Sequence, residues 1–294
     1  MYLIWLSVLG LAIGSFLNVV ALRYDPDKFI FNRRTLGGRS ACPKCENKLN
    51  WFELVPLLSF IFLRGRCRNC KASISFQYPL VEIFSALIFL FVPLFIHSSK
   101  FLVLVGDLNL GGVEKIILSI LFVLVFLTLL LVFLIDLRLK IIPDELNLFL
   151  IILGALLIFF TQSGFDLTGG SFLGSYAGIF GLRSNIWLNH LSALFFGALF
   201  FGALILITRG RGMGMGDLKL SAALGFLFGW PDILLIVAIA FILGSIIGLL
   251  NMVTGRKRWK SYLPFGPFLA LSSIIIFFWG HNIVSVYFNL FSFQ

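Results

Sequence analysis

The chain has 294 residues, of which 60% are hydrophobic and 12% are charged, with a formal net charge of +10. Soluble globular domains carry about twice that share of charged residues, so this composition excludes a soluble domain. Apolar runs of about 20 residues, the length with which an α-helix crosses a bilayer, recur along the whole chain. The composition therefore predicts an all-α polytopic membrane protein.

About eight segments are predicted to cross the membrane. They are residues 1–22, 79–97, 116–135, 146–162, 188–208, 218–230, 233–254 and 265–286. The first lacks a basic n-region and ends on Arg23, so we interpret it as a membrane helix and not as a cleaved signal peptide. The sixth is short and rich in glycine, which leaves seven or eight spans open. Eight spans place both termini on the outer side.

The distribution of basic residues orients these spans. The four loops 23–78, 136–145, 209–217 and 255–264, with Lys219 just after the third, hold 20 of the 23 Lys and Arg residues. Basic residues concentrate in cytoplasmic loops, so this side is predicted to be the cytoplasm. The positive charge is then explained by topology and contact with membrane lipid, and it does not indicate nucleic-acid binding.

All four cysteines lie in the first of these loops. They form two Cys-x-x-Cys pairs, Cys42 with Cys45 and Cys67 with Cys70, separated by 21 residues. This spacing is one residue beyond the usual range for a four-cysteine zinc ribbon, in which a closed tetrahedral site is structural. Two disulfides or a redox-active pair are the alternatives, and a reducing cytoplasm disfavours the disulfides. We expect structural Zn²⁺ to fold a loop that is too small to bury a core.

Three aspartates lie near the predicted cytoplasmic face. Asp136 ends the third predicted helix, where the helix dipole disfavours a negative charge. Asp144 follows Pro143 at the start of the next helix, and capping there is a sufficient explanation for it. Asp217 follows the glycine-rich run that contains Gly214 and Gly216, which allow close backbone approach. Capping of the next helix is again the alternative for Asp217.

Elimination narrows the chemistry that these residues can perform. The three histidines, His97, His190 and His281, are all predicted on the outer side, so a zinc protease or a serine–histidine relay is disfavoured. Asp136 and Asp217 remain as a pair of carboxyls at the inner face. Two close carboxyls in a low-dielectric site share one proton, so one can act as base and the other as acid. This is the chemistry of an aspartyl protease.

The ordered set of motifs resembles the bacterial type IV prepilin peptidases over nearly the whole chain. The matching stretches are Gly14-Ser15-Phe16-Leu17-Asn18-Val19, both Cys-x-x-Cys pairs, Pro56-x-x-Ser59, Leu63-Arg64-Gly65-Arg66-Cys67, Tyr78-Pro79-x-x-Glu82, Asp136 with Ile142-Pro143-Asp144, Gly214-x-Gly216-Asp217-x-Lys219 and Pro264-Phe265-Gly266-Pro267. The Gly-x-Gly-Asp tetrapeptide alone is a weak indication of this family, whereas the ordered set of motifs is specific for it.

The resemblance implies a bifunctional enzyme of the bacterial inner membrane with its active site facing the cytoplasm. It implies that Asp136 and Asp217 are catalytic, with Gly214, Gly216, Asp144 and Lys219 in support. The substrates would be prepilins or pseudopilins of a pilus or a type II secretion system. Their basic leader is cut off, and the new N-terminus is methylated with S-adenosylmethionine.

The resemblance also suggests a division of the chain into a first membrane helix (1–22), a four-cysteine cytoplasmic loop (23–78) and a membrane-embedded peptidase core (79–294). No Rossmann glycine fingerprint marks a methyl-donor site, so the methyl transfer rests on the resemblance alone. The alternatives are a leader peptidase without methyl transfer, and a transporter or assembly scaffold with a zinc loop.

Overall fold

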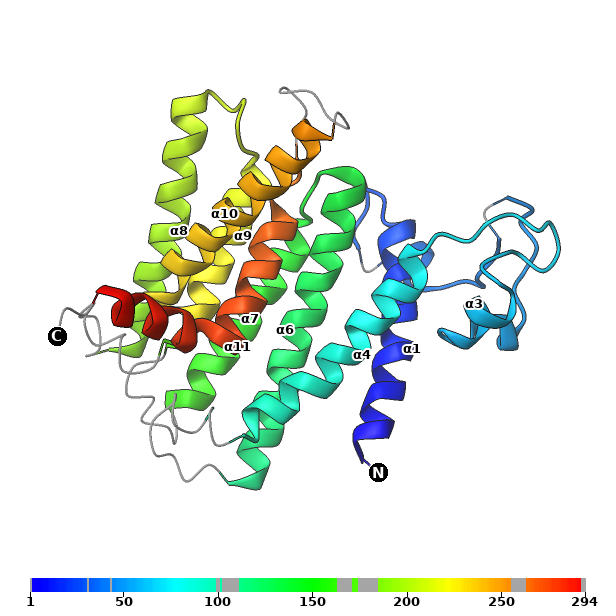
Figure 1. Cartoon of the computed structure of the whole chain (residues 1–294), viewed down its shortest axis with the longest axis horizontal. Helices are drawn as coiled ribbons and strands as arrows, with labels where there is room; N and C mark the ends of the chain where they lie inside the picture. The colour runs from blue at the N-terminus through cyan, green and yellow to red at the C-terminus, as the bar shows by residue number, and fades with distance from the viewer. Residues whose placement is uncertain are drawn as a thin grey trace. The chain divides into compact units, whose positions relative to one another are not determined.

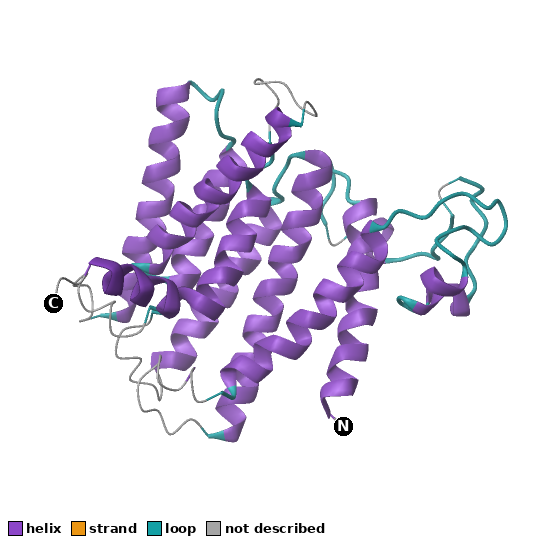
Figure 2. Cartoon of the chain, in the orientation of Figure 1, coloured by secondary structure: helices purple, strands orange, loops and turns teal. Residues whose placement is uncertain are grey.

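The structure is a computed structural model that describes residues 2–30, 32–42, 44–98, 101, 111–162, 171–173, 185–254 and 263–291. The described residues are mainly helical, and their β-structure consists of two isolated bridges (Figure 2). The chain divides into two compact units, Met1–Leu94 and Phe95–Gln294.

Two long helices, α1 (Tyr2–Arg23) and α4 (Gln77–Ile96), dominate the first unit. They pack closely because α1 presents glycines to α4. A Cβ atom on Gly10 would lie 2.7 Å from the Cα of Ala86, and one on Gly14 would lie 2.8 Å from the Cα of Glu82. Small residues four apart let two membrane helices approach to backbone contact.

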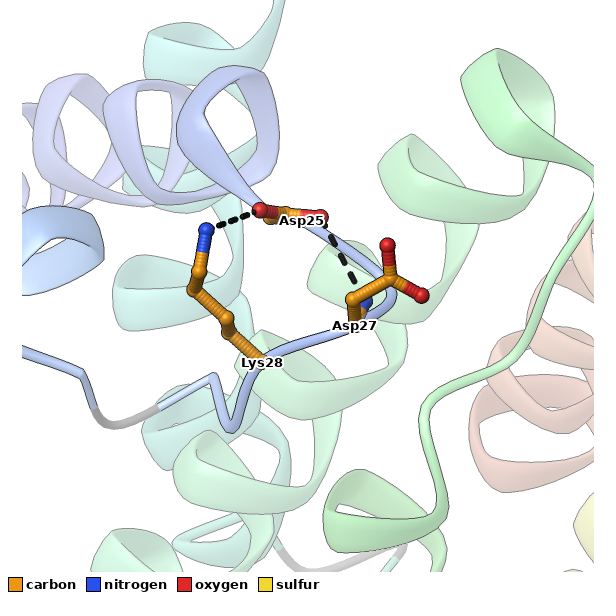
Figure 3. Close-up of polar contacts among 3 residues, drawn as sticks. All are labelled: Asp25, Asp27 and Lys28. Atoms are coloured by element: carbon orange, nitrogen blue, oxygen red, sulfur yellow. Dashed lines mark hydrogen bonds and ion pairs between the residues drawn. The ribbon is translucent and has the colours of Figure 1, made fainter.

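The chain turns sharply where α1 ends. Lys28 Nζ lies 2.6 Å from Asp25 Oδ2, and the backbone N–H of Asp27 donates to Asp25 Oδ1 at 3.3 Å (Figure 3). Asp25 thus caps its own turn, and the exposed ion pair adds less than about 1 kcal/mol. Three short helices follow before α4: α2 (Arg33–Leu36), η1 (Trp51–Leu54) and α3 (Leu58–Phe62).

In the part of the second unit that the structure describes, six helices form a bundle (Figure 1). They are α6 (Gly112–Leu139), α7 (Asp144–Gln162), α8 (Ile186–Thr208), α9 (Met215–Phe228), α10 (Asp232–Val253) and α11 (Gly266–Phe291). The short helix α9 contacts α7, α8, α10 and α11, and its residues from Leu220 onward are almost all buried. A Cβ atom on Gly197 of α8 would lie 2.6 Å from the carbonyl oxygen of Ser221, so α8 and α9 also meet backbone to backbone.

The helices confirm the predicted fold class. Each of the eight predicted segments corresponds to a described helix, and six are long and apolar enough to cross a membrane: α1, α4, α6, α8, α10 and α11. The chain is therefore a multi-pass membrane protein. Helix α9 has 14 residues, or about 21 Å, which is less than the hydrocarbon thickness. The count of eight spans stays a prediction, and residues 102–110, 163–170, 174–184 and 255–262 in the connections between helices lie outside the described residues.

Two of the histidines have structural partners at the end of the bundle away from Asp217. His190 of α8 is buried, with Nδ1 2.8 Å from the carbonyl oxygen of Phe226 near the end of α9. His281 Nδ1 lies 3.2 Å from the carbonyl oxygen of Leu173. Both imidazoles bind main-chain groups there, consistent with their exclusion from the predicted chemistry.

Candidate functional site: a carboxyl pair and a four-thiol cluster

Asp136 lies in the last turn of α6 and is 4% exposed. The helix ends three residues later at Leu139, and the next residue, Lys140, adopts a left-handed conformation in which its N–H donates to the Asp136 carbonyl at 2.8 Å. The Asp136 side chain accepts a hydrogen bond from the backbone N–H of Gly266, 3.0 Å from Oδ2. A carboxylate that opposes the dipole of its own helix is thus held by the first N–H of another helix, α11.

Gly266 fits this position because it has no side chain. A Cβ atom there would lie 2.7 Å from Asp136 Oδ2 and 3.2 Å from Ile142 Cδ1. The Pro264–Pro267 motif indicates the start of the last helix and contributes to the family resemblance, but no contact between Gly266 and Asp136 was predicted. A glycine at the first position of a helix that follows a proline was the only available signal.

Asp217 lies in the first turn of α9 and is partly buried. Its Oδ2 accepts the backbone N–H of Gly214 at 3.1 Å, so the capping alternative describes the local geometry correctly. Burial raises the pKa of the Asp217 carboxyl, and the hydrogen bond from Gly214 opposes that rise. Capping fixes the carboxyl and leaves Oδ1 available, so the two interpretations are compatible.

Ile142 connects the surroundings of the two aspartates. A Cβ atom on Gly216 would lie 3.2 Å from Ile142 Cβ, and Gly266 approaches the same side chain. Gly216 thus packs closely against the Ile142 side chain, and approach of its backbone to a substrate stays a prediction. The ends of α6, α9 and α11 meet around this residue, and a coulombic interaction links the carboxyls of Asp136 and Asp217. Two negative charges close together in a partly desolvated site repel each other, which favours a state in which the two carboxyls share one proton.

Asp144 and Lys219 form an ion pair beside these carboxyls. Lys219 Nζ lies 2.8 Å from Asp144 Oδ1 and 2.7 Å from Oδ2. Asp144 is the first residue of α7, as predicted, and its carboxylate joins α7 to the first turn of α9, two residues after Asp217. Local capping does not account for this contact between residues 75 positions apart in the chain, and the sequence contains no signal that predicts it.

The four cysteines form one cluster. Their Sγ atoms all lie within 4.8 Å of one another, with Cys42 and Cys70 separated by 3.8 Å and Cys45 and Cys67 by 4.0 Å. These distances are far longer than a disulfide bond. Sulfur atoms at the corners of a tetrahedron about 2.3 Å from a central zinc lie about 3.8 Å apart. The thiols therefore fit Zn²⁺.

The two halves of the cluster have the same backbone geometry. The N–H of Cys42 donates to Asn47 and that of Cys67 donates to Ala72, and in each half a β-bridge closes the turn. The residue after each second cysteine, Glu46 or Lys71, has a positive φ of 55° or 58°. Each Cys-x-x-Cys pair thus forms a tight hook that aims two thiols inward.

The thiols differ in acidity in the absence of a cation. Backbone hydrogen bonds from Lys44 and Cys45 lower the pKa of the Cys42 thiol to about 6. A backbone hydrogen bond from Ala72 lowers the pKa of Cys70, but desolvation and the hydrogen bonds shared with the other thiols outweigh it and raise it to about 11. The negative charge of one thiolate opposes deprotonation of the neighbouring thiols, and a bound dication compensates this repulsion.

Comparison with known proteins agrees with this architecture. A model described as the Bacterial Peptidase A24 N-terminal domain matches residues 8–96, and one described as the Type IV leader peptidase family matches residues 121–249. The chain belongs to the type IV leader peptidase family. The second match includes Asp136 and Asp217, and the first includes all four cysteines.

Similar proteins match over almost their whole length. A protein of Aeromonas hydrophila is 32% identical over 98% of this chain and 94% of its own, and one of Burkholderia pseudomallei (strain 1026b) is 33% identical over 95% and 86%. A protein of Legionella pneumophila is 30% identical over 98% and 94%. All three are named prepilin leader peptidase/N-methyltransferase. No solved structure matches the chain.

Proposed function

We propose that this chain cleaves the leader peptide of prepilins or pseudopilins and then methylates the new N-terminus, with Asp136 and Asp217 as the catalytic pair of the cleavage step. The observation that carries the assignment is the convergence of these two carboxyls at the ends of α6 and α9. Family membership and the names of the similar proteins support the substrate class and both activities.

The peptidase step uses one carboxyl as base and the other as acid. The ionised carboxyl takes a proton from water, whose oxygen attacks the scissile carbonyl carbon, while the protonated carboxyl donates its proton to the carbonyl oxygen. Collapse of the tetrahedral intermediate breaks the C–N bond, and the leaving amine takes up a proton. Each aspartate accepts one backbone N–H, Asp136 from Gly266 and Asp217 from Gly214, so the site holds both side chains in place.

The methyl-transfer step is supported by the similar proteins and uses S-adenosylmethionine as donor. When bound, S-adenosylmethionine would supply the methyl group, and the amine nitrogen that accepts it would lose a proton. The described residues contain no strand that could precede a glycine-rich nucleotide loop, so they do not fit a Rossmann donor site. We therefore assign no residue to donor binding.

The zinc ion would be structural in this proposal. Cys42, Cys45, Cys67 and Cys70 supply four thiolates and leave no open coordination position, so the ion would hold the two hooks of the loop together.

We further place the protein in the bacterial inner membrane, with residues 23–78 and both aspartates at the cytoplasmic face. The excess of basic residues in the loops on that side supports this orientation. Division into a first helix (1–22), the four-cysteine loop (23–78) and a peptidase core (79–294) is part of the same proposal. The oligomeric state is left open.

The test is a mass spectrum of a prepilin peptide after incubation with the detergent-purified protein and S-adenosylmethionine. Asp136→Asn and Asp217→Asn should each reduce cleavage by about 10⁴-fold or more, with protein yield unchanged. Asp27→Asn changes an exposed aspartate of the turn after α1 and is the matched control. Normal cleavage by either of the first two variants would disprove the assignment. A cleaved but unmethylated product would retain the peptidase alone, and aspartate-dependent flux without cleavage would favour a transporter.

A further inference from the structure

The segment between the two cysteine pairs exposes a group of large apolar side chains. In α3, Leu58, Ile61 and Phe62 are 52%, 66% and 80% exposed and share one helical face by their spacing. Helix η1 contacts α3 and adds Trp51, 79% exposed, and Leu54, 42% exposed. We call these five side chains the apolar face of the loop. Exposed clusters of this kind mark sites of contact with a partner or a membrane.

Two contacts fix α3 to the start of α4. The backbone N–H of Leu57, immediately before α3, donates to Glu82 Oε2 at 2.8 Å, and Glu82 is buried. The ring of Phe60 meets that of Phe76 edge to face with centroids 5.6 Å apart, and Phe76 directly precedes α4. The apolar face is therefore held beside the first two turns of α4 and cannot move away from it freely.

The depth of this attachment follows from helix geometry. Helix α4 has 20 residues and a length of about 30 Å, which matches the hydrocarbon thickness of a bilayer. Glu82 lies five residues after Gln77, so the attachment point is about 7–8 Å from the start of the helix. Interfacial helices bury their apolar faces by about 5–10 Å at the boundary between headgroups and acyl chains. The position of the attachment point along α4 therefore agrees with the depth at which interfacial helices lie.

The charge around the apolar face suits an anionic surface. Between residues 51 and 76 the chain carries four basic residues, Arg64, Arg66, Arg68 and Lys71, against one acidic residue, Glu53. All four are exposed, and the guanidinium of Arg68 lies 5.2 Å from the ring centroid of Phe52 in η1. Each basic residue near an anionic leaflet contributes about 1 kcal/mol.

We propose that the apolar face of the loop docks on the membrane surface, with Trp51, Ile61 and Phe62 inserted among the lipid headgroups and the neighbouring basic side chains on anionic lipid phosphates. The occupant is the bilayer itself, because both ends of the loop continue into membrane-spanning helices and because α3 is fixed at interfacial depth. The zinc cluster is then held against the membrane and not suspended in the cytoplasm.

Photocrosslinking tests this proposal on the full chain in nanodiscs of phosphatidylethanolamine and phosphatidylglycerol. p-Benzoyl-L-phenylalanine replaces Phe62 in one sample and Asn47, an exposed residue of the first hook, in the matched control. Position 62 should give phospholipid adducts at a yield about tenfold above position 47, and Ile61→Asp should lower that yield. Replacing the phosphatidylglycerol by phosphatidylcholine should lower it several-fold.

Adducts from position 62 that join mainly to the chain itself, to a second copy or to an added prepilin peptide would overturn the proposal, as would a lipid yield equal to that of position 47. A lipid yield that does not change when phosphatidylglycerol is replaced by phosphatidylcholine would overturn the proposed contact between the basic side chains and anionic lipid. Quenching of Trp51 by lipids brominated near the headgroup, taken as the difference from Trp51→Phe, provides a second readout with an unaltered α3. Absence of that quenching would contradict docking even if the crosslinker variant misfolds.

Discussion

The backbone N–H of Gly266 and the Asp136 carboxylate, 130 residues apart in the chain, form a buried hydrogen bond of 3.0 Å. This contact places the start of α11 directly on one of the two aspartates. A side chain at position 266 would occupy the space of the carboxylate oxygen, so this glycine controls where the oxygen lies.

Gly266→Ala should therefore disturb the site without unfolding the bundle. The added methyl group must displace Asp136 Oδ2 from a point 2.7 Å away, and a misplacement of about 1 Å costs about 100-fold in rate. The measurement is kcat/KM for cleavage of a prepilin peptide. Gly248→Ala in α10, where a Cβ atom meets nothing within 4 Å, is the control and should be near wild type. Equal activities of the two variants would remove the proposed role of Gly266.

The ion pair of Asp144 and Lys219 should matter for activity more than for stability. The side chains of Lys219 and Asp144 are 44% and 68% exposed, so loss of the pair should change the free energy of unfolding by less than about 1 kcal/mol. The pair positions the first turn of α9, and Lys219→Met or Asp144→Asn should lower kcat by roughly tenfold.

A charge-swapped double variant, Asp144→Lys with Lys219→Asp, separates orientation from individual charge. It should recover part of the activity lost in either charge-reversed single variant. If the double variant is no more active than the singles, the pair does not act as a unit.

Zinc removal should unfold the loop. The purified chain should contain one zinc per chain, and a chelator or Cys67→Ser should make residues 44–76 sensitive to limited proteolysis, because the hooks have no other core. Protons compete with the metal for thiolates, so zinc affinity should fall steadily as the pH is lowered and most steeply below about 6, where Cys42, the most acidic thiol, is also protonated in the zinc-free loop. A protease-resistant loop in the zinc-free protein would contradict this prediction.

The packing of α1 on α4 should be intolerant of side chains at Gly14. Gly14→Val drives its side chain into the backbone at Val81 and Glu82, and overpacking of this kind costs about 1–3 kcal/mol. Thermal unfolding in detergent measures the effect. Gly112→Val, at a position with no neighbour within 4 Å of a Cβ atom, is the matched substitution. Equal unfolding temperatures would show that α1 has room to move away from α4.

Hydropathy and motif spacing predicted the helices and the thiol cluster because both are encoded locally. The helix ends were less accurate: α6 covers Gly112–Leu139, whereas 116–135 was predicted. Polar residues extend it, since Glu114 accepts the N–H of Gly111 at 2.7 Å and so starts the helix outside its apolar run.

The contacts that define the site could not be predicted, because they join distant parts of the chain. Asp144 looked like a cap and is bound by Lys219, while Gly266 looked like part of a helix start and binds Asp136. Leu57 reaches Glu82 in the same way. Neither helical periodicity nor the spacing of a motif contains information about such pairs.

The two cysteine hooks turn the 21 residues between them into a ring that a bound metal closes. As long as the contacts of α3 with Glu82 and Phe76 are kept, lengthening this ring costs chain entropy that grows only with the logarithm of its size. The four cysteines and the flanking helices α1 and α4 need not change. The four-cysteine loop can thus differ while the peptidase core stays the same, which would adapt one catalytic site to membranes of different lipid composition.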